Sequence, residues 1–438
     1  MATDKIMHRH VLKLAGPIIL ANISLPLLGA VDTAMMGHMD GPQYLAGLAI
    51  ASTVFASIYW CLGFLRMGTT GFAAQSLGTE DKAALGLSFA RAALLGLAMA
   101  FGVMLLQAPI AALAFSVLEG SDQALGAGKD YFDIRIWGAP AALVNFAIIG
   151  WMIGVQRTGD ALIVQLVMNV LNAALNVLFV IEFGWGIEGI ALGTVIAEYT
   201  AVALGLFLVR RRFRQLGATV PRSKLLEPAG LSRLLSVNGD IFVRTFFLMI
   251  AFAMITREGG RLGDVVLAAN GILLNLNLFV AFGLDGFAQA GEALVGRSYG
   301  ARARSDLRQA VRISTIWAAI TAALFSLVYL LAGGLIVDLY TSIPEVQAAT
   351  RTYLVWVIIA PLAAVWCFQL DGIFIGAQHT RDMRNMMVIA FAAFVAALYG
   401  LMPIWGNHGL WAAMIVFYIV RAATLAIRYP AIERAVER

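Results

Sequence analysis

The chain has 438 residues, of which 61% are hydrophobic and only 13% are charged, and its mean hydropathy is +0.83. A soluble domain carries roughly 25% charged residues, so water is excluded as the solvent for most of this surface. The net charge of +5 would suit a nucleic-acid partner only if the cations formed a patch. The two cysteines, Cys61 and Cys367, both lie in apolar runs, which favours buried thiols over a disulfide framework.

Apolar stretches long enough to cross about 30 Å of hydrocarbon recur from one end of the chain to the other. In chain order, we predict twelve transmembrane helices over residues 12–36, 44–72, 87–113, 130–156, 161–182, 187–210, 236–256, 264–290, 310–338, 351–377, 386–404 and 408–428. The segment between the sixth and seventh helices is basic and contains Pro221 and Pro228. We therefore expect an N-lobe at 1–210, a basic cytoplasmic linker at 211–235 and a C-lobe at 236–438.

The charges of the connections alternate sharply along the chain. Residues at one set of alternate connections supply 24 of the 31 Lys and Arg residues, whereas the opposite set includes Arg135, Arg257 and Arg351. Because loops rich in Lys and Arg stay in the cytoplasm, this pattern predicts a multi-pass protein of the inner membrane with both termini inside. The basic excess is thus a topology signal, and nucleic-acid binding is not expected.

An internal repeat appears when the sequence is shifted by 222 residues. Gly154, Gln156, Thr158 and Asp160 then fall on the four residues Gly376, Gln378, Thr380 and Asp382. Further matches in register join Ala46 with Ala268 and Ser76 with Ser298, and the register later slips to 220. Six helices per half is an even number, so both halves enter from the same side. The sequence predicts an all-α fold of two six-helix bundles related by a parallel pseudo-two-fold repeat, as in several transporters.

Enzyme chemistry finds no support in the sequence. The five histidines show no metal-ligand spacing, and no Gly-rich loop ends in Gly-Lys-Ser/Thr. We expect no cofactor and no firmly bound metal, and ATP-driven transport is disfavoured. A two-bundle architecture with a cleft favours a secondary transporter over a membrane-embedded enzyme or a non-transporting scaffold.

Asp32 lies deep in the first predicted helix. Pro17 and Pro26 precede it, and each removes a helix hydrogen bond and favours a bend. An ionisable group inside the membrane is costly and is a functional candidate by default. No basic residue lies near Asp32 in the sequence, so burial favours its protonated form and allows proton exchange. The alternative is an acid hydrogen-bonded for packing alone.

Polar side chains in the fifth and sixth helices form a second candidate set. Asn172 and Asn176 are one turn apart and share a face, as do Thr194 and Glu198, and Asn169 adds a third amide. Such oxygen atoms could bind a hard cation such as Na⁺. They could equally form the interhelical hydrogen bonds that hold a bundle together.

The second half carries its own buried charges. Asp240 and Arg244 are spaced i, i+4 and could form a structural ion pair, while Asp285 and Glu292 share a helix face and Asp371 lies in the tenth helix. Excess acids in this lobe would leave at least one protonated or available to a cationic ligand. We interpret these five residues as a C-lobe polar network that binds substrate or stabilises packing.

The chain resembles the multidrug and toxic compound extrusion (MATE) transporters, in particular the branch of DNA-damage-inducible protein F (DinF). The resemblance covers nearly the whole length and is carried by LAGPIILANISLPLLGAVDTAMMGH at 14–38, GWMIGVQRTGD at 150–160, GWGIEGIALGTVIAEY at 184–199, NGDIFVRTFF at 238–247, LDGFAQAGEALVGRSYGAR at 284–302 and LDGIFIGAQHTRDMRN at 370–385. It implies a V-shaped, twelve-helix exporter of organic cations and other amphiphiles in exchange for H⁺ or Na⁺.

The resemblance also assigns the coupling residues. The family's helix-1 acid corresponds to Asp32, its helix-5 pair to Asn172 and Asn176, and its helix-6 threonine to Thr194. Asn176 departs from the pattern, because many relatives have an aspartate there, and the lost charge weakens a Na⁺ site. We therefore expect an H⁺-coupled, monomeric antiporter that acts on amphipathic or cationic small molecules among membrane lipids. The alternatives are a Na⁺-coupled antiporter and a flippase for lipids or lipid-linked substrates.

Overall fold

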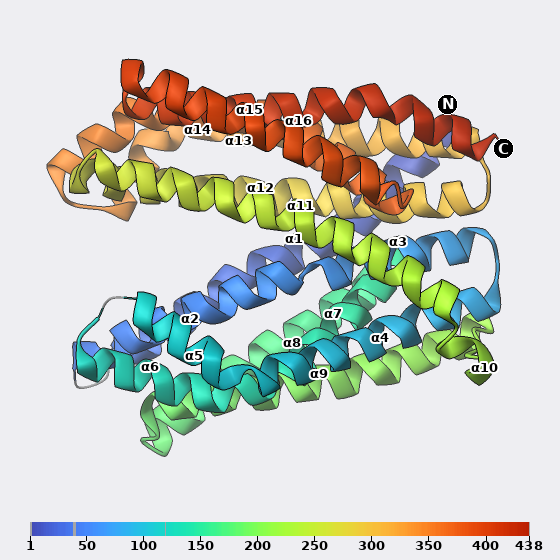
Figure 1. Cartoon of the computed structure of the whole chain (residues 1–438), viewed down its shortest axis with the longest axis horizontal. Helices are drawn as coiled ribbons and strands as arrows, with labels where there is room; N and C mark the ends of the chain where they lie inside the picture. Colours follow the sequence, from blue (N-terminus) through green and yellow to red (C-terminus); the bar gives the residue numbers. More distant parts are fainter. Residues whose placement is uncertain (1, 38–40, 119, 438) are drawn as a thin grey trace. The chain divides into compact units, whose positions relative to one another are not determined.

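The computed structural model describes residues 2–37, 41–118 and 120–437, apart from side chains at 2–5, 25, 27, 28, 30, 31, 34, 36 and 37. Every regular element in these ranges is helical (Figure 1). The N-terminal half contains α1 (Ala2–Gly37), α2 (Pro42–Leu62), α3 (Phe64–Gly78), α4 (Lys82–Leu105), α5 (Gln107–Val117), α6 (Asp122–Arg135), the 3₁₀ helix η1 (Ile136–Gly138), α7 (Ala139–Gly154), α8 (Thr158–Asn176), the π-helix η2 (Val177–Glu182) and α9 (Gly186–Leu216). The C-terminal half contains α10 (Arg222–Leu225), α11 (Pro228–Arg261), α12 (Asp264–Gly300), α13 (Arg304–Tyr340), α14 (Pro344–Gly376), α15 (Thr380–Trp405) and α16 (Asn407–Val436).

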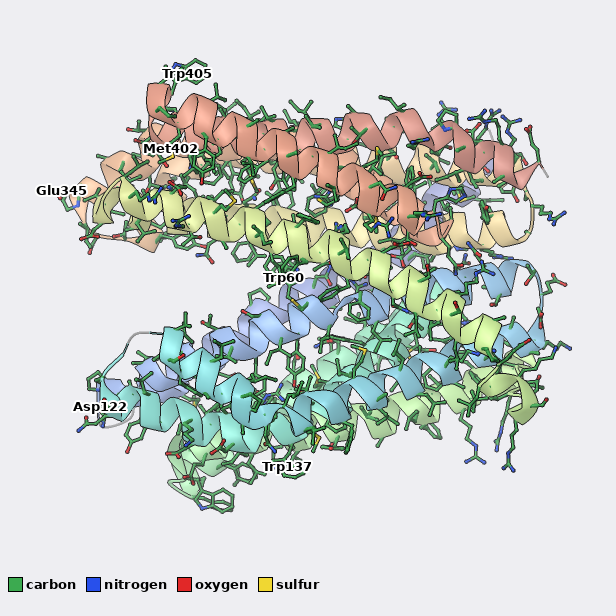
Figure 2. All side chains as sticks on the ribbon, viewed as in Figure 1. Trp60, Asp122, Trp137, Glu345, Met402 and Trp405 are labelled. Carbon is green, nitrogen blue, oxygen red and sulfur yellow. The ribbon has the colours of Figure 1, made fainter. Side chains whose placement is uncertain are left out.

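The described residues form 11 helical spans that are long and apolar enough to cross a membrane, and α1 corresponds to the remaining predicted span. Some spans combine two elements, as α2 continues into α3 across Gly63. Large apolar side chains stay exposed, including Leu339 and the two tryptophans Trp137 and Trp405 (Figure 2). Exposure of this kind suits a surface covered by lipid. The predicted all-helical membrane fold is confirmed.

The chain divides into two compact units. The N-unit comprises Leu20–Leu235, and the C-unit comprises Met1–Ile19 together with Ser236–Arg438. The boundaries therefore fall inside two helices, α1 and α11, and the first turns of α1 belong to the C-unit. In the N-unit α8 packs on α9 and α3 on α7; in the C-unit α12 packs on α14 and α15 on α16.

Backbone conformation repeats between the units at the offset seen in the sequence. The described non-glycine residues with positive φ are Glu80, Gln156, Arg302 and Gln378, with φ between 54° and 61°. They form two pairs that are each 222 residues apart. Because residues other than glycine rarely adopt this backbone conformation, the matching turns show that the sequence repeat is also a structural one.

Close helix crossings repeat in the same way. A Cβ atom at Gly150 of α7 would overlap the backbone of Arg66 on α3. At the equivalent place in the C-unit, a Cβ atom at Gly372 of α14 would overlap the backbone of Ala288 on α12. Small residues let transmembrane helices approach closely and pack well. These two glycines thus fix corresponding helix pairs at short distance in both units.

Gly372→Ala should therefore destabilise the C-unit, because the new methyl group meets the Ala288 carbonyl and must push the two helices apart. We expect a loss of about 1–3 kcal/mol in the free energy of unfolding, the usual cost of overpacking. Gly400→Ala is the matched control, since that helical glycine has open space around it. Unfolding of the detergent-solubilised protein measures both; equal effects of the two substitutions would contradict this account.

The basic segment at 211–235 is largely helical in the structure. Helix α9 extends to Leu216, and α11 already begins at Pro228. Arg91 of α4 holds the connection between them, because its Nε donates to the Leu225 carbonyl at 3.1 Å and its guanidinium pairs with Glu227 at 3.7 Å. The segment is thereby tied to the N-unit.

Candidate functional site

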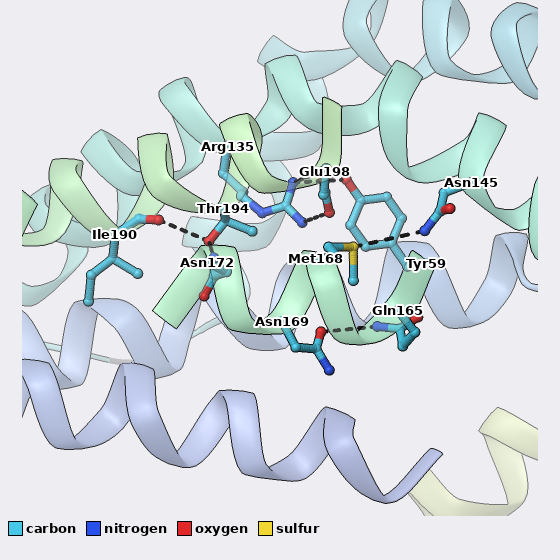
Figure 3. A network of polar contacts seen from close by, with 10 residues as sticks. All are labelled: Tyr59, Arg135, Asn145, Gln165, Met168, Asn169, Asn172, Ile190, Thr194 and Glu198. Carbon is cyan, nitrogen blue, oxygen red and sulfur yellow. Dashed lines mark hydrogen bonds and ion pairs between the residues drawn. The ribbon is translucent and has the colours of Figure 1, made fainter. Parts of the chain in front are cut away.

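A continuous chain of hydrogen bonds in the N-unit joins the four residues assigned to cation coupling. The Asn176 amide nitrogen donates to Asp32 Oδ1 at 2.6 Å and to Asn172 Oδ1 at 3.1 Å. The Asn172 amide nitrogen donates to Thr194 Oγ1 at 2.8 Å, and that hydroxyl donates to the Ile190 carbonyl at 2.9 Å. Figure 3 shows the Asn172–Thr194–Ile190 part of this chain. Asp32 thus lies at the end of an ordered polar path.

Local structure brings these side chains together from three helices. Asn172 and Asn176 lie on one face of α8 and are almost fully buried. Gly193 of α9 makes room for them, since a Cβ atom there would lie only 2.6 Å from Asn176 Oδ1. The π-helix η2 starts directly after Asn176. Single π-helical turns within α-helices often occur at functional sites.

A second polar contact ties α8 to α1 one turn further along. The Asn169 amide nitrogen donates to Ser24 Oγ at 2.7 Å, and Gln165 donates to Asn169 Oδ1 at 3.0 Å. These bonds are of the interhelical packing type. Pro17 and Pro26 both lie within α1, which remains a helix from Ala2 to Gly37, and the boundary between the two units falls between them.

A buried ion pair adjoins the coupling residues. Arg135 of α6 donates through both terminal nitrogens to the Glu198 carboxylate of α9, at 2.5 and 3.0 Å (Figure 3). Its guanidinium also lies 5.2 Å from the ring centroid of Phe55 and 5.5 Å from that of Tyr59. Gly138 leaves space for the pair, because a Cβ atom there would lie 2.5 Å from both partners.

Arg135 changes the electrostatic surroundings expected for Asp32. The sequence places no base near this acid, and it places Arg135 at an outer connection. In the structure Arg135 is 7% exposed and interacts electrostatically with Asp32. Sequence reasoning missed this residue because its partner Glu198 is 63 positions away; the signal that could have suggested it was an acid at mid-helix that required a cation.

The geometry bears on which cation the N-unit can hold. The Asn176 amide nitrogen lies between the Asp32 and Asn172 oxygens, where a metal ion that bridges them would have to lie. A Na⁺ ion requires several oxygen ligands, so this amide would have to turn over. Among the described residues no cluster of three or more His, Cys, Asp or Glu side chains has metal-binding geometry.

The C-unit network differs from the expected one. Asp240 accepts from Arg384 at 2.7 Å and from Thr380 at 3.0 Å, so the predicted Asp240–Arg244 pair is wrong. An i, i+4 spacing permits a contact but does not require it, and Asp240 is bound instead by Arg384 and Thr380 of α15. Arg244 instead pairs with Asp371 of α14.

The other C-unit acids lie in separate surroundings. Asp371 is bridged by two arginines, Arg244 and Arg421 of α16. Glu292 lies in α12, is 2% exposed, and its backbone packs against Gly376. Asp285 lies two turns earlier on the same face of α12 and is half-buried. Around Asp371 the expected excess of acids is therefore replaced by an excess of arginine.

Comparisons with known proteins agree with the fold and the repeat. A family model described as MatE matches twice, at residues 17–178 and 241–400. DNA damage-inducible protein F of Escherichia coli K12 is 42% identical over 413 residues, which cover 94% of this chain and 90% of that protein. A probable multidrug resistance protein NorM of Neisseria meningitidis serogroup B is 26% identical, with 94% and 91% covered.

Solved structures show the same architecture. The MATE transporter VcmN of Vibrio cholerae in its bent form superposes with a TM-score of 0.90 at 19% identity, and the match covers 100% of this chain and 99% of that one. A MOP superfamily transporter of Pyrococcus furiosus gives a TM-score of 0.87 at 17% identity, with 99% and 97% covered. Since the MatE model spans most of both halves and the sequence match to the E. coli protein is close, this chain belongs to the MatE family and is a multi-pass membrane transporter, not an enzyme.

Proposed function

We propose that the protein is an H⁺-coupled antiporter that exports amphipathic, often cationic, compounds, with Asp32 as the coupling acid. The observation that supports this most directly is the position of the Asp32 carboxylate. It ends a buried hydrogen-bond chain through Asn176, Asn172 and Thr194, and it lies within the electrostatic influence of Arg135. A carboxylate in such surroundings can change its charge without a free counter-ion.

Protonation would reorder the hydrogen-bond chain. As a carboxylate, Asp32 accepts from the Asn176 amide nitrogen. As a carboxylic acid it gains an O–H donor that needs an acceptor. Asn176 Oδ1 is a buried acceptor with no hydrogen-bond partner among the described residues. If the Asn176 amide turns over, the protonated Asp32 can donate to Asn176 Oδ1. The direction in which hydrogen bonds are donated along the chain of side chains then reverses. The site thus has two hydrogen-bonded arrangements that a single proton exchanges.

The substrate class follows from charge and surroundings. A lipophilic cation would compete with the proton for the Asp32 carboxylate, while the exposed and apolar helix faces suit an amphipathic body. The NorM relatives are named for multidrug resistance, which supports this class. The basic connections support a cytoplasmic location of both termini, and the bacterial DinF relative supports the inner membrane.

The first experiment uses protein reconstituted into vesicles with an imposed pH gradient and a fluorescent lipophilic cation. We expect the gradient to drive accumulation of the dye, and addition of dye to release protons in the opposite direction. Transport that is independent of both the H⁺ and the Na⁺ gradient would contradict antiport and favour the flippase alternative. Movement of labelled lipid across the membrane of the same vesicles would then test that alternative.

Substitution Asn176→Asp distinguishes proton from sodium coupling. The wild-type protein should respond little to Na⁺, because the Asn176 amide nitrogen fills the space between two oxygens. An aspartate there removes that donor and adds a charged oxygen ligand. We expect the variant to gain stimulation by an inward Na⁺ gradient, measured by the same dye assay. Strong Na⁺ dependence of the wild-type protein would contradict the assignment.

A further inference from the structure

A buried cluster of charges in the C-unit plays no part in the proton coupling proposed above. Arg244 of α11 and Arg421 of α16 both donate through Nη2 to the same oxygen, Oδ2 of Asp371 on α14. All three side chains are nearly inaccessible to solvent, and Arg421 is only 1% exposed. Two arginines and one aspartate leave this cluster with one uncompensated positive charge.

The cluster also has unused hydrogen-bonding capacity. The Nε atoms of Arg244 and Arg421 are buried and have no hydrogen-bond partner among the described residues, and the same holds for Oδ1 of Asp371. Two N–H donors left unpaired away from water are costly. Arginine is never deprotonated in proteins, so the charge cannot be removed by loss of a proton.

Apart from Asp371, the groups that interact most strongly with Arg421 carry no negative charge at ordinary pH. Cys367 and Tyr418 interact with Arg421, and both are neutral at ordinary pH. The ring of Phe368 lies 5.9 Å from the Arg421 guanidinium carbon, and Asp240 is engaged by Arg384. An aromatic ring lowers the energy of a nearby cation but does not balance its charge.

We infer that the Arg244–Arg421 pair binds one monovalent anion in the C-unit. The anion would take hydrogen bonds from the two free Nε–H groups, while a water molecule carried with it could donate to Asp371 Oδ1. The chemistry fits a free halide or the carboxylate or sulfate headgroup of an amphiphile. This is the opposite polarity to the cation site expected for the C-lobe acids. Binding is measurable without transport, so the inference does not depend on proton coupling.

The test measures thermal unfolding of the full-length protein in neutral detergent while choline gluconate is replaced by choline chloride at constant ionic strength. We expect chloride to raise the unfolding temperature in a saturable manner. Arg421→Gln leaves a neutral Arg244–Asp371 pair and should remove this shift. Arg351→Gln should retain it, because Arg351 is an exposed residue of the same unit that pairs with Asp338. No shift in the wild type, or an unchanged shift in Arg421→Gln, would overturn the inference.

A second variant keeps the test decisive if Arg421→Gln does not fold. Asp371→Asn raises the cluster charge by one, so its stability should depend more strongly on chloride than that of the wild type; an equal dependence would contradict the site. Decanoate and decyltrimethylammonium separate the two anion sources. The site takes an amphiphile headgroup if decanoate, at a concentration far below that of chloride, abolishes the chloride-induced rise in unfolding temperature and decyltrimethylammonium does not. If neither does, it takes a free halide.

Discussion

Substitution Asp32→Asn should abolish proton-coupled export while leaving the fold intact. Asparagine has nearly the same shape and can still accept the 2.6 Å hydrogen bond from Asn176, but it cannot take up or release a proton. Dye accumulation driven by a pH gradient in reconstituted vesicles should therefore fall to the level of protein-free vesicles, and dye addition should release no protons. A variant that retains full antiport would disprove the mechanism.

The matched control for this experiment is Asp133→Asn. Asp133 lies on α6 in the same unit but is exposed, so the substitution removes an equal charge without touching the buried chain. We expect wild-type transport from it. Thermal unfolding of both variants shows whether a loss of transport reflects misfolding, because replacing the half-buried Asp32 carboxylate by its amide should change stability much less than transport.

The helices were predictable because their signal is local. Each span includes a predominantly apolar stretch long enough to cross a membrane, and lipid leaves the backbone no alternative to internal hydrogen bonds. The repeat was equally visible, since the turns at Gln156 and Gln378 need the same unusual backbone conformation and share the surrounding motif. Element ends were less predictable, as the extension of α9 into the basic segment shows.

The coupling site was predictable only in part. Asn172 and Asn176 could be placed on one face from their spacing, and the family resemblance connected them with Asp32. The pairing of charges could not be predicted, because ion pairs between helices join residues far apart in sequence. Arg135 meets Glu198 across 63 positions, and Arg244 meets Asp371 across 127. The i, i+4 spacing concerns contacts within one helix only, so it led to the wrong prediction that Arg244 pairs with Asp240.

Glu198→Gln should produce the largest loss of stability in the N-unit. The substitution leaves the Arg135 guanidinium buried without its carboxylate partner. Breaking a buried ion pair in this way costs about 3–5 kcal/mol, because one charge remains uncompensated. Unfolding of the solubilised protein should show this loss. Glu188→Gln is the control on the same helix, where the acid is exposed, and should change stability by less than about 0.5 kcal/mol.

The double variant Arg135→Met with Glu198→Leu separates the structural role of the pair from its electrostatic one. Two apolar side chains of similar volume remove both buried charges, so most of the stability should return. The restored fold would still lack the cation that acts on Asp32. The pH at which dye export is half-maximal should then differ from that of the wild-type protein. If stability returns and the pH profile of export stays unchanged, Arg135 serves packing alone.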